Sequence, residues 1–194
     1  DYMAIAINDD LIDTERAAKV SGSRFGYLKG DLARLEFALV QFAFNRLSKE
    51  GFVPIIPPVM VREEMMAGMG YIDTPEDRGE RYEFEKDKLF LVGTSEQSVV
   101  PMHANDIFDE KYLPRRYVSF STCFRREAGS YGKDTKGILR VHQFDKVEMV
   151  SFTIPQDSRK EHEVLVKMEE ELMQALKLPY RGVALCTGDT ARPS

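Results

Sequence analysis

The chain has 194 residues, of which 43% are hydrophobic and 30% charged; this composition excludes a disordered chain and suits one sizeable domain, or most of one. Its formal net charge of −5 argues against a generally basic nucleic-acid binder. No apolar run approaches the roughly 20 residues that cross a bilayer, and Cys123 and Cys186 lack the spacing of a metal site or a disulfide framework, so we expect a reduced, cytoplasmic location.

The first third of the chain is dominated by one predicted helix. Residues 11–29 are expected to form a lead-in loop and a short strand. Residues 31–49 are predicted to be helical, with Asp31 as the N-cap, Gly51 as the stop, and an apolar stripe at helical spacing: Leu32, Leu35, Leu39, Phe42, Ala43 and Leu47. A strand at 52–56, cut short by two prolines, and a short helix at 59–69 follow.

The rest of the chain is predicted to contain a hairpin and a second long helix. Residues 73–88 are polar and suggest a surface excursion, followed by a strand at 89–92, a turn at 93–96 and a helix at 97–108 interrupted near Pro101. Strands are expected at 116–126 and 138–152. The last helix carries an apolar stripe and ends before Pro179: Val164, Leu165, Met168, Leu172, Ala175 and Leu176. Hairpin strands among long helices predict an α+β fold, an antiparallel sheet flanked by helices.

The segment FRREAGSYGKDTKGILRVHQFDKVE, residues 124–148, is the most informative part of the sequence. Between Arg115 and Arg140 there are seven cations and only two acids. An acidic protein with one local cationic region is typical of a protein that holds phosphates at a defined site. The hairpin therefore predicts a ligand site with a glycine-punctuated loop, GSYGKDTKG, over it.

Arg125 and Glu127 are the first candidate pair in this hairpin. On a strand they share a face, so Arg125 can grip a phosphate while Glu127 accepts from an exocyclic amine of a base. A cross-strand salt bridge on a wet face is the alternative, and it is the commoner outcome for an isolated pair.

The second strand offers an aromatic ring and a carboxylate. In strand register, alternate residues from Arg140 to Glu148 share one face. Phe144 can stack on a base, an interaction worth roughly 1–3 kcal/mol, or can simply pack in the core. Glu148 can meet an amine or be an ordinary strand carboxylate, and for both residues the plain alternative is the commoner one.

The turn Gly93-Thr94-Ser95-Glu96 places hydroxyls and a carboxylate before a helix. Such a turn suits an ammonium group bound through Glu96, and it equally suits an N-cap formed by Thr94 or Ser95. The three histidines have no ligand spacing to one another, and neither common glycine-rich phosphate loop is present.

Together these motifs closely resemble those of the class II aminoacyl-tRNA synthetases, in the version found in seryl-tRNA synthetases. The segment 124–148 resembles motif 2, GFVPIIPPVMV resembles motif 1, and LVGTSE resembles the TxE element that binds the amino acid. LIDTERAAKVSGSRF resembles the entry to the catalytic domain. The resemblance spans nearly the whole chain.

The resemblance implies a role for each matching residue. Arg125 would hold the α-phosphate of ATP, Glu127 would contact adenine, and Phe144 would stack on it beside Val141. Arg126 and Arg140 would also belong to the ATP site, Arg140 toward the polyphosphate. The serine side would be formed by Thr94, Ser95, Glu96 and Glu148.

The resemblance also implies the reaction and its partners. L-serine and ATP would form seryl-adenylate with Mg²⁺ as cofactor, and the seryl group would pass to the 3′ end of tRNA(Ser); whether selenocysteine tRNA is also charged stays open. The loop 129–137 would close on ATP and help seat the tRNA. The region between Asp31 and Pro58 would form a homodimer interface, and no membrane partner is implied.

Two family segments lie outside this sequence. One is the N-terminal helical arm that grips tRNA, and the other is the C-terminal region with motif 3, its ATP-binding arginine and a metal-binding carboxylate. We therefore expect residues 1–194 to be a partial catalytic domain without a metal ligand of its own. Two alternatives remain: a synthetase-like paralogue that loads an amino acid onto a carrier protein, and a synthetase-derived binding protein without catalysis.

Overall fold

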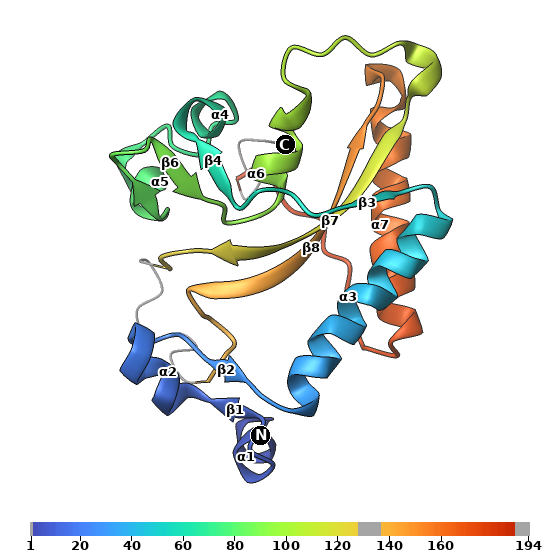
Figure 1. Cartoon of the computed structure of the whole chain (residues 1–194). Helices are drawn as coiled ribbons and strands as arrows, with labels where there is room; N and C mark the ends of the chain where they lie inside the picture. The colour runs from blue at the N-terminus through green and yellow to red at the C-terminus, as the bar shows by residue number, and fades with distance from the viewer. Residues whose placement is uncertain (1, 128–136, 189–194) are drawn as a thin grey trace.

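The computed structural model describes residues 2–127 and 137–188 (Figure 1). Its long elements are two helices, α3 (Asp31–Lys49) and α7 (Ser158–Ala175), and two ten-residue strands, β7 (Arg115–Phe124) and β8 (Gln143–Phe152). The shorter elements are α1 (Tyr2–Asn8), β1 (Ile12–Asp13), α2 (Thr14–Ser21), β2 (Tyr27–Leu28), β3 (Val53–Ile55), β4 (Met60–Arg62), α4 (Glu63–Gly68), α5 (Pro75–Gly79), β5 (Glu83–Phe84), β6 (Leu89–Leu91) and α6 (Glu96–Val99).

The central sheet is built around β7. It pairs with β8 in an antiparallel register from Arg115–Phe152 to Phe124–Gln143, and β3 joins its other edge in parallel. The expected α+β fold is confirmed, with one difference: the β3–β7 pair makes this sheet mixed. A parallel neighbour is possible because the long excursion between β3 and β7 allows the chain to cross over.

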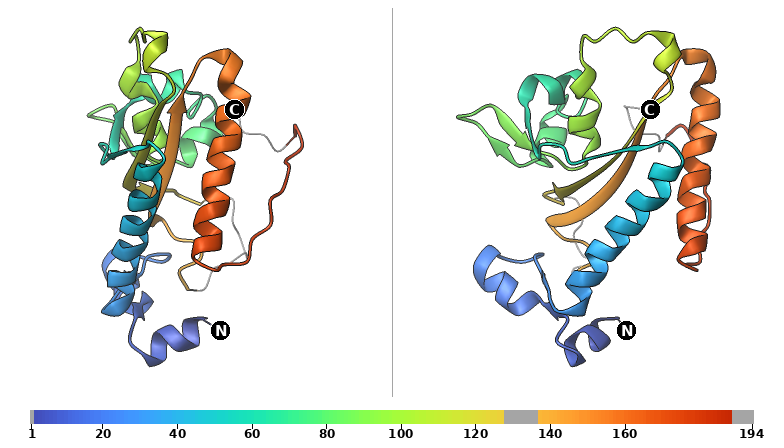
Figure 2. Two further views of the ribbon diagram at one scale, coloured as in Figure 1. Left: turned by 90° about the vertical axis from the view of Figure 1, so that its right-hand side faces the viewer. Right: turned by 45° about the vertical axis from the view of Figure 1, so that its right-hand side comes forward.

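Helices α3 and α7 lie side by side against one face of this sheet, as the views in Figure 2 show. Alternate residues of β7 and β8 point toward them, and the buried core consists of Leu47, Phe52, Val118 and Met168. Arg116 and Glu161 tie α7 to β7 through a paired guanidinium–carboxylate contact, with Nε to Oε2 at 2.9 Å. This face is therefore structural, and the opposite face of the sheet is left for a site.

A small antiparallel sheet, in the order β4-β6-β5, faces that opposite side of β7 and β8 (Figures 1 and 2). With α4 and α5 it forms a lobe with its own buried cluster: Val61, Met66, Phe90 and Val92. The chain leaves β6 and passes directly into the turn 93–96. The lobe therefore delivers this turn to the open face of the central sheet.

Several predicted element boundaries differ from the structure. Residues 14–21 form α2, because the Asp13 side chain accepts from the Arg16 N–H and starts a helix there. Asp31 is the first residue of α3 instead of its N-cap, which is Gly30. The predicted helix at 59–69 is β4 followed by α4, and the one at 97–108 reduces to α6 and a 3-10 turn at Pro101–His103.

The largest correction concerns the hairpin strands. β7 ends at Phe124 and β8 begins at Gln143, so Arg125, Glu127 and Arg140 all lie beyond the strands. Glu127 has a positive φ of 53°, which lies outside the β region of backbone conformation. No helix in the described part of the chain is both long and apolar enough to cross a bilayer.

Candidate functional site

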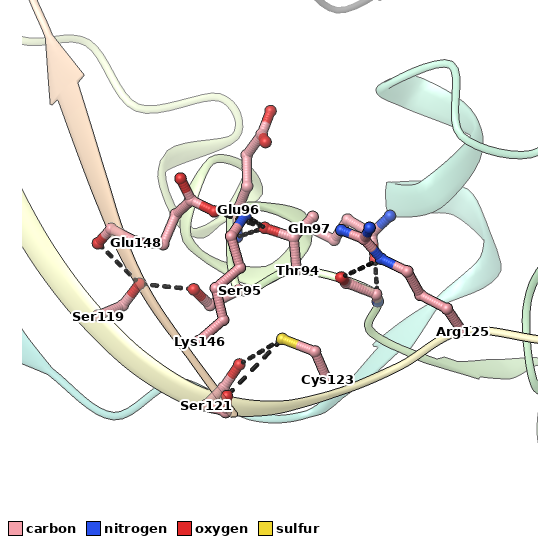
Figure 3. A network of polar contacts seen from close by, with 11 residues as sticks. Thr94, Ser95, Glu96, Gln97, Ser119, Ser121, Cys123, Arg125, Lys146 and Glu148 are labelled. Atoms are coloured by element: carbon pink, nitrogen blue, oxygen red, sulfur yellow. Dashed lines mark hydrogen bonds and ion pairs between the residues drawn. The ribbon is translucent and has the colours of Figure 1, made fainter. Parts of the chain in front are cut away.

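The turn 93–96 is fixed to the open face of the central sheet by buried hydroxyls (Figure 3). The Ser95 and Ser119 hydroxyl oxygens lie 2.7 Å apart, and both residues are fully buried. Within the turn, the Gly93 N–H donates to the Gln97 side chain at 2.8 Å. Because buried polar groups are costly to leave without partners, these bonds hold the turn in one position over β7.

Thr94, Lys146 and Glu148 form a network beside this turn (Figure 3). The Thr94 hydroxyl donates to Glu148 Oε2 at 2.8 Å and accepts from Lys146 Nζ at 3.1 Å. Lys146 also forms an ion pair with Glu148 through the same carboxylate oxygen. Glu96 extends from the first turn of α6 next to them. We call these four residues the carboxylate end of the site.

The carboxylate of Glu96 stands in an unusual environment. Burial and the neighbouring Glu148 carboxylate raise the pKa of Glu96, while a hydrogen bond from Tyr71 and the charge of Lys146 act in the opposite direction. Burial and the Glu96 charge likewise raise the pKa of the Tyr71 hydroxyl. Lys146 neutralises one of these two close carboxylates, and the remaining negative charge favours a second cation, such as the ammonium group of a small molecule.

The opposite end of the site is built on Arg125. Its Nε donates to the Gly93 carbonyl at 3.0 Å, and its guanidinium lies 5.2 Å from the centre of the Phe144 ring. The Arg125 backbone N–H pairs with the His142 carbonyl at 2.9 Å, which continues the ladder one step beyond β7. The structure thus brings together Arg125 and Phe144, two residues that the sequence analysis singled out separately.

Glu127 and Arg140 meet each other across the mouth of the hairpin. Their side chains form an ion pair, and the Glu127 carbonyl accepts from Arg24 at 2.9 Å. The prediction that Arg125 and Glu127 share a strand face is wrong, because the chain turns at Glu127. Glu127 does form a salt bridge, but with Arg140 and outside the strands; Arg125 instead donates to Gly93 and lies against the Phe144 ring. We call Arg125, Glu127, Arg140 and Phe144 the arginine end.

Arg126 stands apart from the arginine end, whereas Val141 lies beside one of its members, Phe144. Arg126 lies on the lobe: its Nε donates to the Arg81 carbonyl at 2.7 Å and its guanidinium lies 4.8 Å from the Tyr82 ring centre. Val141 lines a hollow of about 400 Å³ between β2 and the starts of α3 and β8, which Phe144 also lines. The expected neighbourhood of Val141 and Phe144 is therefore present, whereas Arg126 has a structural contact of its own.

Two site residues were missed by the sequence analysis. Lys146 was assigned only to a strand face, although it contacts both Thr94 and Glu148. Arg81 comes from the polar segment 73–88; burial and the positive charge of Arg125 lower the pKa of Arg81, which places the two cations close together. The alternation of β8 points to Lys146, since it shares a face with Glu148, but nothing in the sequence distinguishes Arg81 from other surface arginines.

Three further candidates for parts of the site are the loop 129–137, the Cys123 thiol and a metal-binding cluster. Of the predicted loop 129–137, only Gly137 belongs to the described residues. Cys123 is buried beneath the site, and burial raises the pKa of its thiol, so it is no nucleophile at neutral pH. No cluster of three or more histidine, cysteine or acidic residues suited to a metal ion occurs within residues 2–127 and 137–188.

The two ends together suit a ligand of mixed charge. The carboxylate end attracts an ammonium group and offers an acceptor to a hydroxyl. At the arginine end, Arg125 is anchored on the Gly93 carbonyl and attracts an anion, and the Phe144 ring is available for stacking. These are the groups that a ligand joining an amino acid to a nucleotide through a phosphate would need.

Comparison with known proteins supports this interpretation. A family model described as the tRNA synthetase class II core domain (G, H, P, S and T) matches residues 81–194. The serine–tRNA ligase of Acidothermus cellulolyticus is 52% identical over 189 residues and that of Beutenbergia cavernae 49%; each match covers 97% of this chain and 44% of the relative. The chain spans less than half the length of these curated relatives.

Solved structures give the same picture. The seryl-tRNA synthetase of Pyrococcus horikoshii complexed with ATP superposes with a TM-score of 0.86 at 46% identity, over 92% of this chain and 40% of that one. The cytoplasmic serine–tRNA ligase of Naegleria fowleri in complex with AMP superposes with a TM-score of 0.81 at 36% identity, over 89% of this chain and 40% of that one.

Proposed function

This chain belongs to the class II core-domain family of tRNA synthetases, and from that premise we propose that it is part of the catalytic domain of a serine–tRNA ligase. The observation that carries the proposal is the carboxylate end: Thr94, Lys146 and Glu148 form a closed polar network beside Glu96. A small amino acid with an ammonium and a hydroxyl group matches this end. Relatives solved with ATP and AMP support a nucleotide as substrate, and we assign it to the arginine end.

The chemistry follows from this arrangement. The serine carboxylate attacks the α-phosphorus of ATP in line, forming an O–P bond as pyrophosphate leaves. The 3′-terminal hydroxyl of tRNA(Ser) then attacks the activated carbonyl, and AMP leaves. In both steps the protein contributes positioning and charge stabilisation.

We assign the residues as follows. Glu96 binds the serine ammonium, and Glu148, oriented by Thr94, accepts from the serine hydroxyl. Ser95 holds the turn on β7. Arg125, anchored on the Gly93 carbonyl, stabilises the charge that develops on the α-phosphate.

At the nucleotide, Phe144 stacks on adenine beside Val141, Glu127 contacts the adenine amine, and Arg140 meets the polyphosphate. Arg126 supports this site from the lobe. Because Glu127 and Arg140 pair with each other, nucleotide binding must replace or reshape that contact. Mg²⁺ would accompany ATP and offset its negative charge; the described residues offer no cluster of acidic or histidine ligands for it.

The proposed partners include a second copy of the protein. Large apolar side chains are exposed on α3 and around β3, among them Phe37 at 67% and Ile56 at 80%. Exposed apolar patches of this kind mark interaction surfaces, which supports a homodimer interface between Asp31 and Pro58. We further propose cytoplasmic activity on tRNA(Ser), with selenocysteine tRNA as an additional substrate to be tested.

The test is amino-acid-dependent exchange of pyrophosphate into ATP by the full-length protein. We expect exchange with serine, and selection against alanine by about 10²-fold or more, because a site built around a hydroxyl leaves buried polar groups without partners when it is missing. Omission of the amino acid is the control. Exchange with glycine or alanine instead would favour the carrier-protein ligase, and no exchange with any amino acid would favour the non-catalytic binding protein.

A further inference from the structure

Lys146 makes its contacts inside the carboxylate end and not toward open solvent. Its side chain is 34% exposed, and its ammonium group reaches both the Thr94 hydroxyl and the Glu148 carboxylate. Lys146 and Glu148 are two residues apart on β8 and so share the open face of the sheet. The Lys146–Glu148 contact is therefore fixed within β8 and does not depend on a loop.

The hydrogen bonds of Glu148 are unequally distributed between its two oxygens. Thr94 Oγ1 and Lys146 Nζ both bind Oε2. Among the described residues, no hydrogen bond reaches Oε1. The carboxylate is thus held by one oxygen, and the other remains available as an acceptor.

The Thr94 hydroxyl already makes all the hydrogen bonds that it can form. It donates its one hydrogen to Glu148 and accepts from Lys146 Nζ and from the Glu96 N–H at 3.3 Å. A hydroxyl has one donor and two acceptor positions. Thr94 therefore orients Glu148 and does not itself receive a hydrogen bond from a ligand ammonium in this arrangement.

The charges of Glu96, Glu148 and Lys146 give the two carboxylates different roles. Two ionised carboxylates and one lysine leave one net negative charge, which one substrate ammonium neutralises. Lys146 is paired with Glu148, so Glu96 is the carboxylate left for that ammonium. Without Lys146, both carboxylates would attract the ammonium group, and Glu148 would lose one of the two contacts that set its orientation.

We propose that Lys146 is a positioning residue that fixes Glu148 and Thr94, so that Glu148 presents Oε1 to the side-chain hydroxyl of the substrate. This inference rests on the proposed function. It assigns the recognition of the hydroxyl, and hence the selection of serine over alanine, to a lysine that need not touch the substrate.

The experiment compares Lys146→Met, Lys146→Gln and Lys146→Arg in the full-length protein by serine- and alanine-dependent pyrophosphate exchange. For Lys146→Met we expect the KM for serine to rise about tenfold to a hundredfold, as for the loss of a hydrogen bond to a charged group. The alanine reaction and the KM for ATP should change less than about threefold, and Lys146→Arg should restore part of the selectivity. Lys167→Met removes an exposed lysine of α7 (69% exposed) and serves as the matched control.

Each outcome decides the role of Lys146. Unchanged selectivity for serine over alanine in Lys146→Met would overturn the positioning role of Lys146. A lower KM for serine in Lys146→Met would also overturn it, because it would mean that Lys146 blocks the ammonium position. If Lys146→Met does not fold, Lys146→Gln tests the same direction with a smaller expected rise in the KM for serine, because glutamine loses the charge but keeps a donor. A wild-type protein without serine-dependent exchange would overturn the proposed function itself, which distinguishes the two failures.

Discussion

The two ends of the site differ in how completely their polar groups are held by the fold. At the carboxylate end, Thr94 is only 6% exposed, and its neighbours Ser95 and Ser119 are fully buried and bonded to each other. At the arginine end, the paired side chains of Arg140 and Glu127 are 39% and 16% exposed. Each end contains an ion pair, but the Lys146–Glu148 pair is bonded to the nearly buried Thr94 hydroxyl, whereas the Arg140–Glu127 pair lies beyond the ends of the strands.

The difference follows from where the residues lie in the fold. Lys146 and Glu148 lie within β8, so the hydrogen bonds of the sheet fix their positions. Thr94 lies on the turn, which the Ser95–Ser119 hydrogen bond holds on β7. Glu127 and Arg140 lie past the ends of these strands, where no ladder holds them. Preorganised groups bind at low cost in reorganisation, so we expect the carboxylate end to determine selectivity and the arginine end to change on binding.

The largest effect is expected from Arg125→Ala, which removes the anchor between the two ends. Loss of one preorganised charge-stabilising group typically costs about 10²–10³ in rate, and we expect a fall of that size in kcat/KM for pyrophosphate exchange. Arg159→Ala, at an exposed position on α7 (94% exposed), should leave the rate unchanged. Wild-type exchange in Arg125→Ala, with an intact fold by thermal denaturation, would contradict the role given to Arg125.

The second prediction concerns pH and the carboxylate end. Burial and Glu148 raise the pKa of Glu96, so this group contributes most to folding stability below its unfolded pKa and loses that contribution as pH rises through the folded pKa. Binding of an ammonium runs the other way, because it needs the ionised carboxylate. Below the pKa the ionised fraction falls about tenfold per pH unit.

The KM for serine should therefore rise as pH falls through the raised pKa, at a higher pH than the ordinary glutamate value of 4.5 would give. Measuring KM for serine and for ATP across the same pH range tests this expectation. If both rise together, the effect does not belong to the carboxylate end.

The third prediction tests the self-paired arginine end by a double-mutant cycle of Glu127→Gln and Arg140→Met. Each change should raise the KM for ATP about fivefold to tenfold, the usual effect of one polar contact, and leave the KM for serine unchanged. The double variant should exceed the product of the two effects, because each single change spares the other residue the cost of breaking their ion pair, and the double variant gains this saving only once. Fully multiplicative effects would indicate that the pair plays no part in nucleotide binding.

The same contrast explains what the sequence analysis predicted. Helical spacing gave α3 and α7 within a few residues, because a buried apolar stripe leaves a periodic pattern. The turn 93–96 and the alternation that places Glu148 on the open face were also correct. These features depend on local pattern, and the fold does not override it.

The errors arise where tertiary contacts decide. The sequence analysis extended the strands through Arg125 and Arg140, since charged residues in alternation look the same inside a strand and beyond its end. The turn at Glu127 depends on contacts with Arg24 and Arg140 from other segments. Helical spacing identifies the α3 stripe without saying which part of it is buried in the chain; Leu35 and Leu39 in its N-terminal half are exposed, which is what a surface for a second copy requires.

The smallest effect is expected from Ser119→Ala, which tests whether buried hydroxyls hold the carboxylate end. This change leaves the Ser95 hydroxyl without its 2.7 Å partner, and an unsatisfied buried hydroxyl costs about 1–3 kcal/mol of unfolding free energy. Urea denaturation of the full-length protein measures the loss, with Ser48→Ala at an exposed position of α3 as the control. Because the turn sits over β7 through this bond, the KM for serine should also rise by about twofold to fivefold while the KM for ATP stays the same. An equal loss of stability without a change in the KM for serine would mean that the sheet supports the turn by packing alone, and the contrast between the two ends would then rest on Lys146 and Thr94.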